Sequence, residues 1–207
     1  MKDLNAGVDL LTFGWSQGGQ AAIFTGEEQP GYAPELAHRG VVAIAPGTSF
    51  PHFMEIPHIY VFARAFNSAY YASLDGFTED GKALIAAADK TCITGVFRES
   101  TKLKGPFFAG ELTDDPAMAK ALELNEPGRH KSGAPILVVH GTADNVVAPE
   151  FTEALLPRAC ESGDTIKVSW YPDKDHRTVI AEGQTEILAW FGDRMLDRAA
   201  STDCPAK

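Results

Sequence analysis

The stretch Val8-Asp-Leu-Leu-Thr-Phe-Gly-Trp-Ser-Gln-Gly-Gly19 decides the fold. It runs from a mostly apolar segment, residues 8–13, through a glycine-flanked turn at Ser16 into the small-residue segment 18–24. A short apolar run bounded by glycines predicts a buried strand, and the segment after the turn is suited to a helix. The stretch therefore predicts a strand, a tight turn that carries a serine, and a helix.

Three further runs predict strands at residues 41–45, 136–140 and 166–171. The first two are continuously apolar, as expected for strands buried on both faces, and the last alternates, as expected nearer a sheet edge. Helices are predicted at 149–160 and at 178–196, where apolar residues fall on one helical face. Strands that alternate with helices imply an α/β fold with a parallel sheet.

The interval between the second and third strands is longer than an ordinary connection, which is two to six residues plus one helix. It contains three predicted helices, at 56–71, 78–88 and 116–124. We interpret it as a helical cap inserted over the carboxyl ends of the strands; the alternative is a pair of additional surface helices. The predicted division is residues 1–46 and 135–198 for the core, 47–134 for the cap and 199–207 for a frayed tail.

The composition is that of a soluble globular protein and argues against two classes of binding partner. Of the 207 residues, 44% are hydrophobic and 22% charged, and the formal net charge is -10. This negative balance, without a cluster of lysine and arginine, argues against binding to nucleic acid or to an anionic membrane face. No apolar run approaches the roughly 18 residues of a transmembrane helix, and the first residues do not form a signal peptide.

The three cysteines, Cys92, Cys160 and Cys204, are far apart in the sequence. They lack the C-x-x-C spacing of a structural zinc site, so we expect no metal there. Their odd number leaves at least one thiol unpaired within the chain. None of them lies at a strand-to-helix turn where a thiol nucleophile is expected.

Ser16 stands at the centre of a Gly-x-Ser-x-Gly pattern, the nucleophile elbow, between a predicted strand and a predicted helix. A serine in so sharp a turn has a strained backbone, and small residues two before and two after it avoid collisions with the neighbouring strand and helix. The amide of Gln17, at the helix N-terminus, is placed to donate a hydrogen bond to a developing oxyanion. We therefore predict Ser16 as a nucleophile and Gln17 as an oxyanion-hole donor.

A serine nucleophile needs a base and an orienting acid. Asp144 follows the third predicted strand and His176 follows the fourth. Because the strands are parallel, both residues lie at the carboxyl ends of the strands, where Ser16 also lies. The order Ser, Asp, His is that of an α/β-hydrolase. We predict Ser16 as nucleophile, His176 as general base and acid, and Asp144 as the group that orients His176.

Each of these assignments has an alternative. Asp144 could be only a turn or capping residue, since Pro149 and a helix follow it. Asp173 and Asp175 are closer in sequence to His176, but we expect them to point to solvent. His140 ends a buried strand, and we expect it to be structural rather than catalytic.

Together these motifs resemble the secretory lipase family, α/β-hydrolases of the yeast lipase A type. The resemblance rests on Gly-x-Ser16-Gln-Gly-Gly-Gln-Ala-Ala, on Ala-Pro-Gly-Thr after the second strand, and on His-Gly-Thr-Ala-Asp144-x-x-Val-x-Pro followed by His176. It implies hydrolysis of small-molecule or lipid carboxylic esters by a secreted enzyme that uses no metal or other cofactor. Position 15 departs from the family pattern, because Trp stands where we expect His or Tyr.

A second departure concerns length, because only 15 residues precede Ser16 here and the family places four strands before the nucleophile strand. The resemblance thus implies that the N-terminal half and the second oxyanion donor are missing. Three hypotheses follow: an ester hydrolase, a non-catalytic fragment or module whose edge strand pairs with a second copy or a separate N-terminal half, and a start codon placed too far downstream.

Aromatic side chains of the predicted cap would line an acyl pocket or meet a lipid interface; the alternative is that they form the core of the cap. These residues are Phe53, Tyr60, Phe62, Phe66, Tyr70, Tyr71 and Phe77.

Overall fold

The computed structural model describes residues 7–49 and 59–206, and the chain divides into two compact units. The sheet unit comprises Met1–Thr48 and Pro127–Lys207, and the helical unit comprises Ser49–Glu126. The helical unit falls within the interval 47–134 interpreted above as a cap, and its role as a cap stays a prediction.

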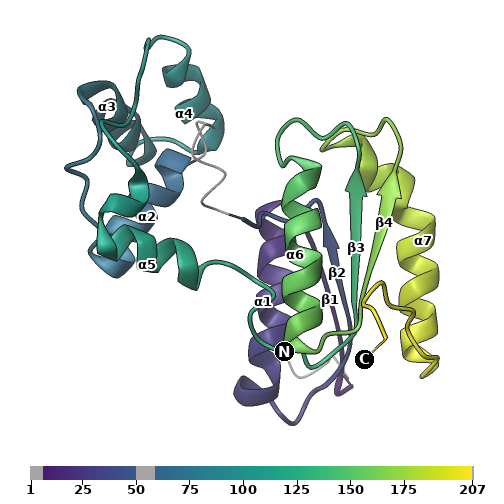
Figure 1. Cartoon of the computed structure of the whole chain (residues 1–207). Coiled ribbons are helices and arrows are strands. Elements are labelled where there is room, and N and C mark those ends of the chain that lie inside the picture. Colours follow the sequence, from purple (N-terminus) through teal and green to yellow (C-terminus); the bar gives the residue numbers. More distant parts are fainter. Residues whose placement is uncertain (1–6, 50–58, 207) are drawn as a thin grey trace. The chain divides into compact units, whose positions relative to one another are not determined.

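Four parallel strands form the sheet, in the order β1-β2-β3-β4 (Figure 1). Their bounds are Asp9–Trp15 for β1, Ala37–Ile44 for β2, Ile136–Gly141 for β3 and Ile166–Tyr171 for β4. The predicted parallel α/β fold is confirmed. β2 begins earlier than predicted because its first residues alternate between buried and half-buried, so only its later part reads as a continuous apolar run.

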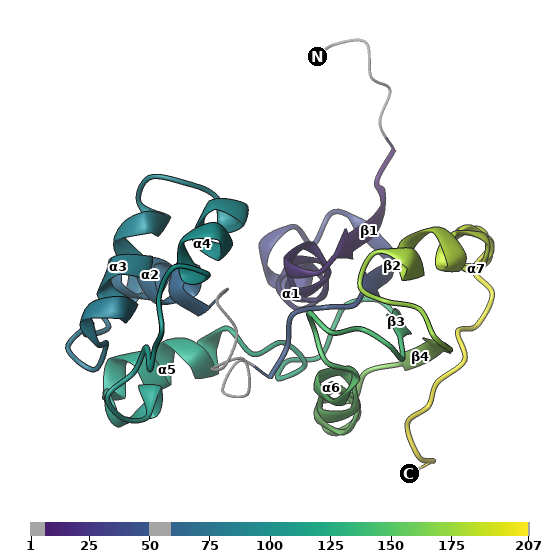
Figure 2. The same ribbon diagram turned by 90° about the horizontal axis from the view of Figure 1, so that it is seen from above.

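Three helices cover the two faces of the sheet (Figure 2). They are α1 (Gln17–Tyr32), α6 (Pro149–Ser162) and α7 (Thr178–Met195). α1 and α6 share one face, where Ile23 and Leu155 pack in one core cluster with Val41 and Val138. α7 covers the other face, where Val179 and Ile187 pack against Val42, Ile44, Leu137 and Val139.

α1 extends well beyond the predicted segment 18–24, although it contains Gly26 and Pro30. The reason is tertiary packing, which overrides weak helix propensity. A Cβ atom at Gly26 would lie 2.4 Å from Ser132 Oγ and 3.0 Å from Val41. Glycine thus lets α1 approach the sheet closely at a position that propensity alone marks as a helix end.

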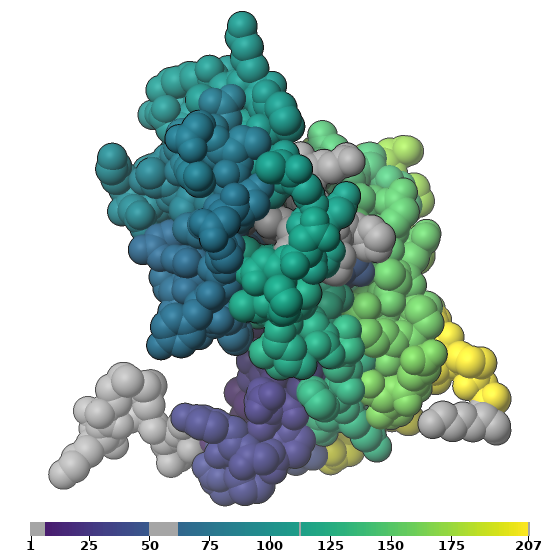
Figure 3. Space-filling model, turned by 60° about the vertical axis from the view of Figure 1, so that its left-hand side comes forward, coloured from purple at the N-terminus to yellow at the C-terminus, as the bar shows by residue number. Residues whose placement is uncertain are grey.

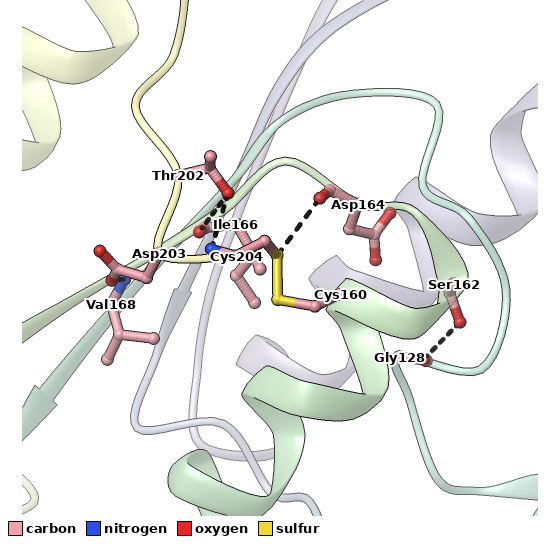
Figure 4. The surroundings of a disulfide bond; sticks show 9 residues. All are labelled: Gly128, Cys160, Ser162, Asp164, Ile166, Val168, Thr202, Asp203 and Cys204. Carbon is pink, nitrogen blue, oxygen red and sulfur yellow. Dashed lines mark hydrogen bonds between the residues drawn. A yellow bond between two sulfur atoms is a disulfide. The ribbon is translucent and has the colours of Figure 1, made fainter. Parts of the chain in front are cut away.

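The C-terminal segment is anchored, so the prediction that residues 199–207 fray is wrong for the described part of the tail. Cys204 forms a disulfide with Cys160 of α6, and the Asp203 amide donates to the Ile166 carbonyl at 2.8 Å (Figure 4). The Asp203 carboxylate in turn accepts from the amide of Val168 at 2.8 Å. Figure 3 shows this segment, in yellow, on the surface of the sheet unit beside α6.

The helical unit consists of short helices. They are α2 (Ile59–Tyr70), α3 (Glu79–Ala88), α4 (Ile93–Ser100), a 3₁₀ turn η2 (Leu112–Asp114) and α5 (Pro116–Leu124). Asp115 caps α5 by accepting from the Ala117 amide at 3.1 Å. The sequence did not predict α4, which is short and contains Gly95 and two β-branched residues in its first turn; burial of Val96 stabilises it.

The aromatic side chains of the helical unit divide between core and surface. Phe66 and Phe77 are buried, whereas Tyr71 is 89% exposed and Tyr70 38% exposed. Phe62 is half-buried and lies 6.2 Å from Phe66, ring centre to ring centre. Phe53, the side chain of Tyr60 and the first residues of the helix predicted at 56–71 lie outside the described residues. In the part that the structure describes, no helix is both long and apolar enough to cross a membrane.

Candidate functional site

Ser16 lies in the turn between β1 and α1 with φ 59° and ψ -123°. A positive φ is rare and strained for a residue with a side chain, and it persists only where the surroundings hold it. Here the Ser16 amide donates to the Ile44 carbonyl of β2 at 2.8 Å, and the Ser16 carbonyl accepts from Gly19 at 2.9 Å and from Gly47 at 3.2 Å. Backbone hydrogen bonds from β2, from α1 and from the loop after β2 therefore fix the serine in this conformation.

The glycines around Ser16 contribute unequally to this turn. A Cβ atom at Gly14 would lie 1.9 Å from the Gly18 carbonyl oxygen, and one at Gly19 would lie 3.0 Å from the Ile44 carbonyl oxygen. At Gly18 a Cβ atom would meet nothing within 4 Å. The steric requirement for glycine therefore falls on Gly14, whose Cβ atom would collide with the backbone of Gly18, whereas position 18 has room for a Cβ atom.

Asp144 and His176 meet although 32 residues separate them. Asp144 lies in the loop after β3 and His176 in the loop after β4, as predicted. His176 Nδ1 lies 2.7 Å from Asp144 Oδ2, and the two side chains are 8% and 0% exposed. A hydrogen bond this short between buried groups holds the imidazole in one orientation.

The Asp144 carboxylate has four hydrogen-bond or charge contacts, two within its own loop and two with histidine rings. Oδ1 accepts from the amides of Val146 and Val147 at 2.9 and 2.8 Å, and Oδ2 faces His176 and, at 3.3 Å, His140 Nε2. Burial alone would raise the pKa of Asp144, but the hydrogen bonds from the two histidines and the two amides hold it well below its ordinary value. The turn-forming and the orienting role of Asp144 thus coexist, one on each oxygen.

Trp15 links the elbow to the loop that carries His176. Its indole Nε1 donates to the His176 carbonyl at 2.8 Å, and its ring centre lies 4.9 Å from that of His176. Because Ser16 is the next residue, this contact sets the elbow beside the histidine. The sequence identifies Trp15 only as a departure from the family pattern, because no local pattern predicts a hydrogen bond to a carbonyl 161 residues away.

The structure also places the residues near the site that were given other roles. Asp175 caps the start of α7, where its carboxylate accepts from the Arg177 and Thr178 amides at 2.9 and 2.8 Å. Asp173 is exposed, as expected. His140 is fully buried and bonded to Thr152, which fits the structural role expected of it, but it also faces Asp144. That second contact was not anticipated.

The side chains of Ser16 and His176 are not joined by a hydrogen bond among the described residues. Such bonds are often long before a substrate binds. Gln17 is the exposed first residue of α1, and its amide donates to no described acceptor. Among the described residues, no group of three or more His, Cys, Asp or Glu side chains could hold a metal ion.

The chain is similar to a known protein family and to solved structures. A sequence model described as "Secretory lipase" matches residues 1–203. Candida antarctica lipase A in its closed state superimposes with a TM-score of 0.75 at 16% identity, over 95% of this chain and 51% of that one. The rice cell wall degrading esterase LipA from Xanthomonas oryzae gives a TM-score of 0.66 at 16% identity, over 91% and 58%.

At these identities the two structures establish the α/β-hydrolase fold of the chain. The chain spans about half the length of each of them. A comparison with curated protein sequences finds no match.

Proposed function

Because this chain belongs to the secretory lipase family, we propose that it carries the catalytic triad of a serine carboxylic-ester hydrolase. Ser16 is the nucleophile, His176 the general base and acid, and Asp144 the group that orients the imidazole. The observation that carries the proposal is the buried hydrogen bond between His176 and Asp144, which Trp15 ties to the strained serine turn.

The hydrogen bonds support a protonation state suited to this reaction. Asp144 is ionised and only accepts, so the proton of the neutral His176 ring lies on Nδ1, as assigned from the hydrogen-bond network. Nε2 is then unprotonated and free to accept the proton of the serine hydroxyl. The low pKa of Asp144 keeps its charge in place for the imidazolium that forms next.

In the proposed first step, Ser16 Oγ attacks the ester carbonyl carbon and its proton passes to His176 Nε2. The negative charge that develops on the carbonyl oxygen accepts a hydrogen bond from the Gln17 amide at the N-terminus of α1. The carbon–oxygen ester bond then breaks, and the leaving alcohol takes the proton from Nε2.

The second half of the reaction releases the acyl group from Ser16. A water molecule gives a proton to His176 Nε2 and attacks the acyl carbon. The ester bond to Ser16 breaks, Oγ recovers the proton from Nε2, and the carboxylic acid leaves. Atoms and protons balance with an ester and water as the only reactants.

The proposed substrate is a small-molecule or lipid ester, and the proposed site of action is outside the cell. The disulfide between Cys160 and Cys204 supports secretion, since disulfides persist in oxidising compartments. We further propose that the helical unit is the cap of the hydrolase. Its exposed Tyr70 and Tyr71 are then the side chains best suited to meet a lipid interface.

A second candidate is a non-catalytic module that pairs with another chain. β1 lies at one edge of the sheet, its residue Phe13 is 55% exposed, and the chain spans about half the length of its structural matches. An exposed apolar edge strand is a template for pairing with a strand from a second chain. The partner in this case is a second copy or a separate N-terminal half.

Labelling with a fluorophosphonate and hydrolysis of a p-nitrophenyl ester test the proposal. Wild-type chain should be labelled and Ser16→Ala should not, with a loss in hydrolysis on the order of 10⁴-fold or more. Ser169→Ala is the matched control, because Ser169 is a half-buried serine bonded to Glu186 and should leave both signals unchanged. Equal rates for wild type and Ser16→Ala would remove Ser16 from the mechanism. An unlabelled dimer in size-exclusion chromatography would favour the module.

A further inference from the structure

A second histidine lies against the proposed triad. His140 is a residue of β3, is fully buried, and stacks on Trp170 of β4 with 5.7 Å between the ring centres. Its Nε2 atom lies 3.0 Å from the Val147 carbonyl oxygen and 3.3 Å from Asp144 Oδ2. Its Nδ1 atom lies 2.7 Å from the hydroxyl of Thr152 in α6, which is also fully buried. The ring therefore spans the space between α6 and the loop that holds Asp144.

The neighbours of His140 determine where its proton lies. A carbonyl and a carboxylate only accept hydrogen bonds, so both neighbours of Nε2 require a proton on that atom. The Thr152 hydroxyl can donate to Nδ1, which is then the acceptor. His140 thus carries a proton on Nε2 that faces both Val147 and Asp144, and the contact of Nδ1 with Thr152 fixes the orientation of the ring.

We propose that His140 is a positioning residue for the Asp144–His176 pair, acting through the 3.3 Å contact between its Nε2–H and the Asp144 carboxylate. The inference rests on the proposed function, in which Asp144 orients His176. A carboxylate that two imidazoles and two amides hold has one orientation, so the direction in which it presents Oδ2 to His176 is fixed.

The contact also limits how strongly Asp144 holds the proton of His176. A second donor to Oδ2 withdraws charge from that oxygen and weakens its attraction for the His176 proton. The exposed carboxylate of Asp175, which caps α7, and the carboxylate of Asp144 repel each other. His140 is one of the four groups that offset the negative charge of Asp144, with His176 and the amides of Val146 and Val147.

The test compares His140→Phe with His140→Gln in the full chain. Phenylalanine keeps a ring beside Trp170 but has no donor, whereas the glutamine amide can place an N–H near the position of Nε2. In His140→Phe we expect the low-field proton resonance of the His176–Asp144 hydrogen bond to move to lower field. The acidic limb of the fluorophosphonate labelling profile should move to higher pH by on the order of one unit. His140→Gln should restore both.

Two further variants keep the test decisive. Thr48→Val removes a second fully buried threonine hydroxyl, which donates to the carbonyl of Phe151 in α6, the helix that also contains Thr152. This variant should leave the resonance in place. If His140→Phe does not fold, His140→Asn takes its place, because its shorter amide reaches toward Thr152 rather than Asp144. A folded variant of either kind with an unmoved resonance and acidic limb would overturn the proposal. A wild-type chain that is not labelled would refute the proposed function, while the resonance would still decide the role of His140.

Discussion

The sheet unit and the helical unit are stabilised by contacts of different range along the sequence. In the sheet unit, the Ser16 amide bonds Ile44, Asp144 bonds His176, and Cys160 is joined to Cys204. In the helical unit, Arg64–Asp89 joins residues 25 apart, but the ion pairs Lys82–Glu79, Lys102–Glu99 and Lys120–Glu123 join residues three apart and are largely exposed. Such surface pairs contribute little to stability, on the order of 0.2–1 kcal/mol each.

The difference between the two units indicates which of them can hold a catalytic site. Catalytic side chains have to be held within fractions of an ångström, which requires buried partners that come from separate elements. The sheet unit supplies such partners, since the loops after β1, β3 and β4 bring the proposed site residues Ser16, Asp144 and His176 to the carboxyl ends of the parallel strands.

The two units can be followed separately in solution. All three tryptophans, Trp15, Trp170 and Trp190, belong to the sheet unit, so tryptophan fluorescence reports on that unit alone. Far-UV circular dichroism reports on the helices of both. The predictions below use the helical unit as the internal reference.

The largest expected effect on stability is removal of the disulfide, which should weaken the sheet unit only. The bridge closes a loop with a sequence separation of 44, for which the chain-entropy relation gives about 4 kcal/mol. The double variant Cys160→Ser, Cys204→Ser should therefore lower the midpoint of the tryptophan transition in urea and leave that of the helical unit in place. Cys92→Ser is the control, because Cys92 is an exposed free thiol. A shift of both transitions together would show that the units unfold as one.

The next effect concerns the glycines of the elbow. Gly14→Ala places a methyl group on the Gly18 carbonyl and should cost about 3 kcal/mol in the free energy of unfolding of the sheet unit. Gly18→Ala is its matched control, since the new methyl meets nothing and alanine favours the helix by about 0.5–1 kcal/mol. Urea titration of both variants by tryptophan fluorescence checks the order. Equal costs would mean that the turn relaxes more than its backbone contacts suggest.

The same contrast between local and long-range contacts explains how much the sequence could predict. Continuous apolar runs indicate buried strands, and the pattern of residues 116–124 indicates a helix; both are local signals, and both predictions are confirmed. The motifs after each strand predict that Asp144 and His176 meet, because the topology of a parallel sheet brings them together. The bond from Trp15 to His176 and the pairing of Cys160 are set by packing between distant segments, so no local pattern carries them.

The smallest of the three effects arises from a buried carboxyl group in α1. Glu27 accepts a hydrogen bond from the Gly128 amide on Oε1, while Oε2 is buried without a partner among the described residues. Burial raises the pKa of Glu27 to about 7, against the effect of the Gly128 bond, and the nearby carboxylate of Asp164 adds to the rise. The folded state thus keeps a proton on Glu27 that the unfolded chain releases above pH 4.5. Stability from this group is complete below that pH and is lost as the pH rises through about 7.

Glu27→Gln should remove this loss, because an amide keeps the carbonyl that Gly128 bonds and carries no charge at any pH. We expect the variant to be more stable than the wild type at pH 8 by about 2 kcal/mol and to show a flatter stability profile between pH 5 and pH 8. Glu28→Gln is the matched control, since Glu28 is the exposed neighbour and acts on Glu27 only through its charge. Urea titrations followed by tryptophan fluorescence at several pH values measure both. A Glu27→Gln profile that falls as steeply as that of the wild type would mean that another group causes the pH dependence of the sheet unit. The next group to replace is then Asp164, because burial raises its pKa as well.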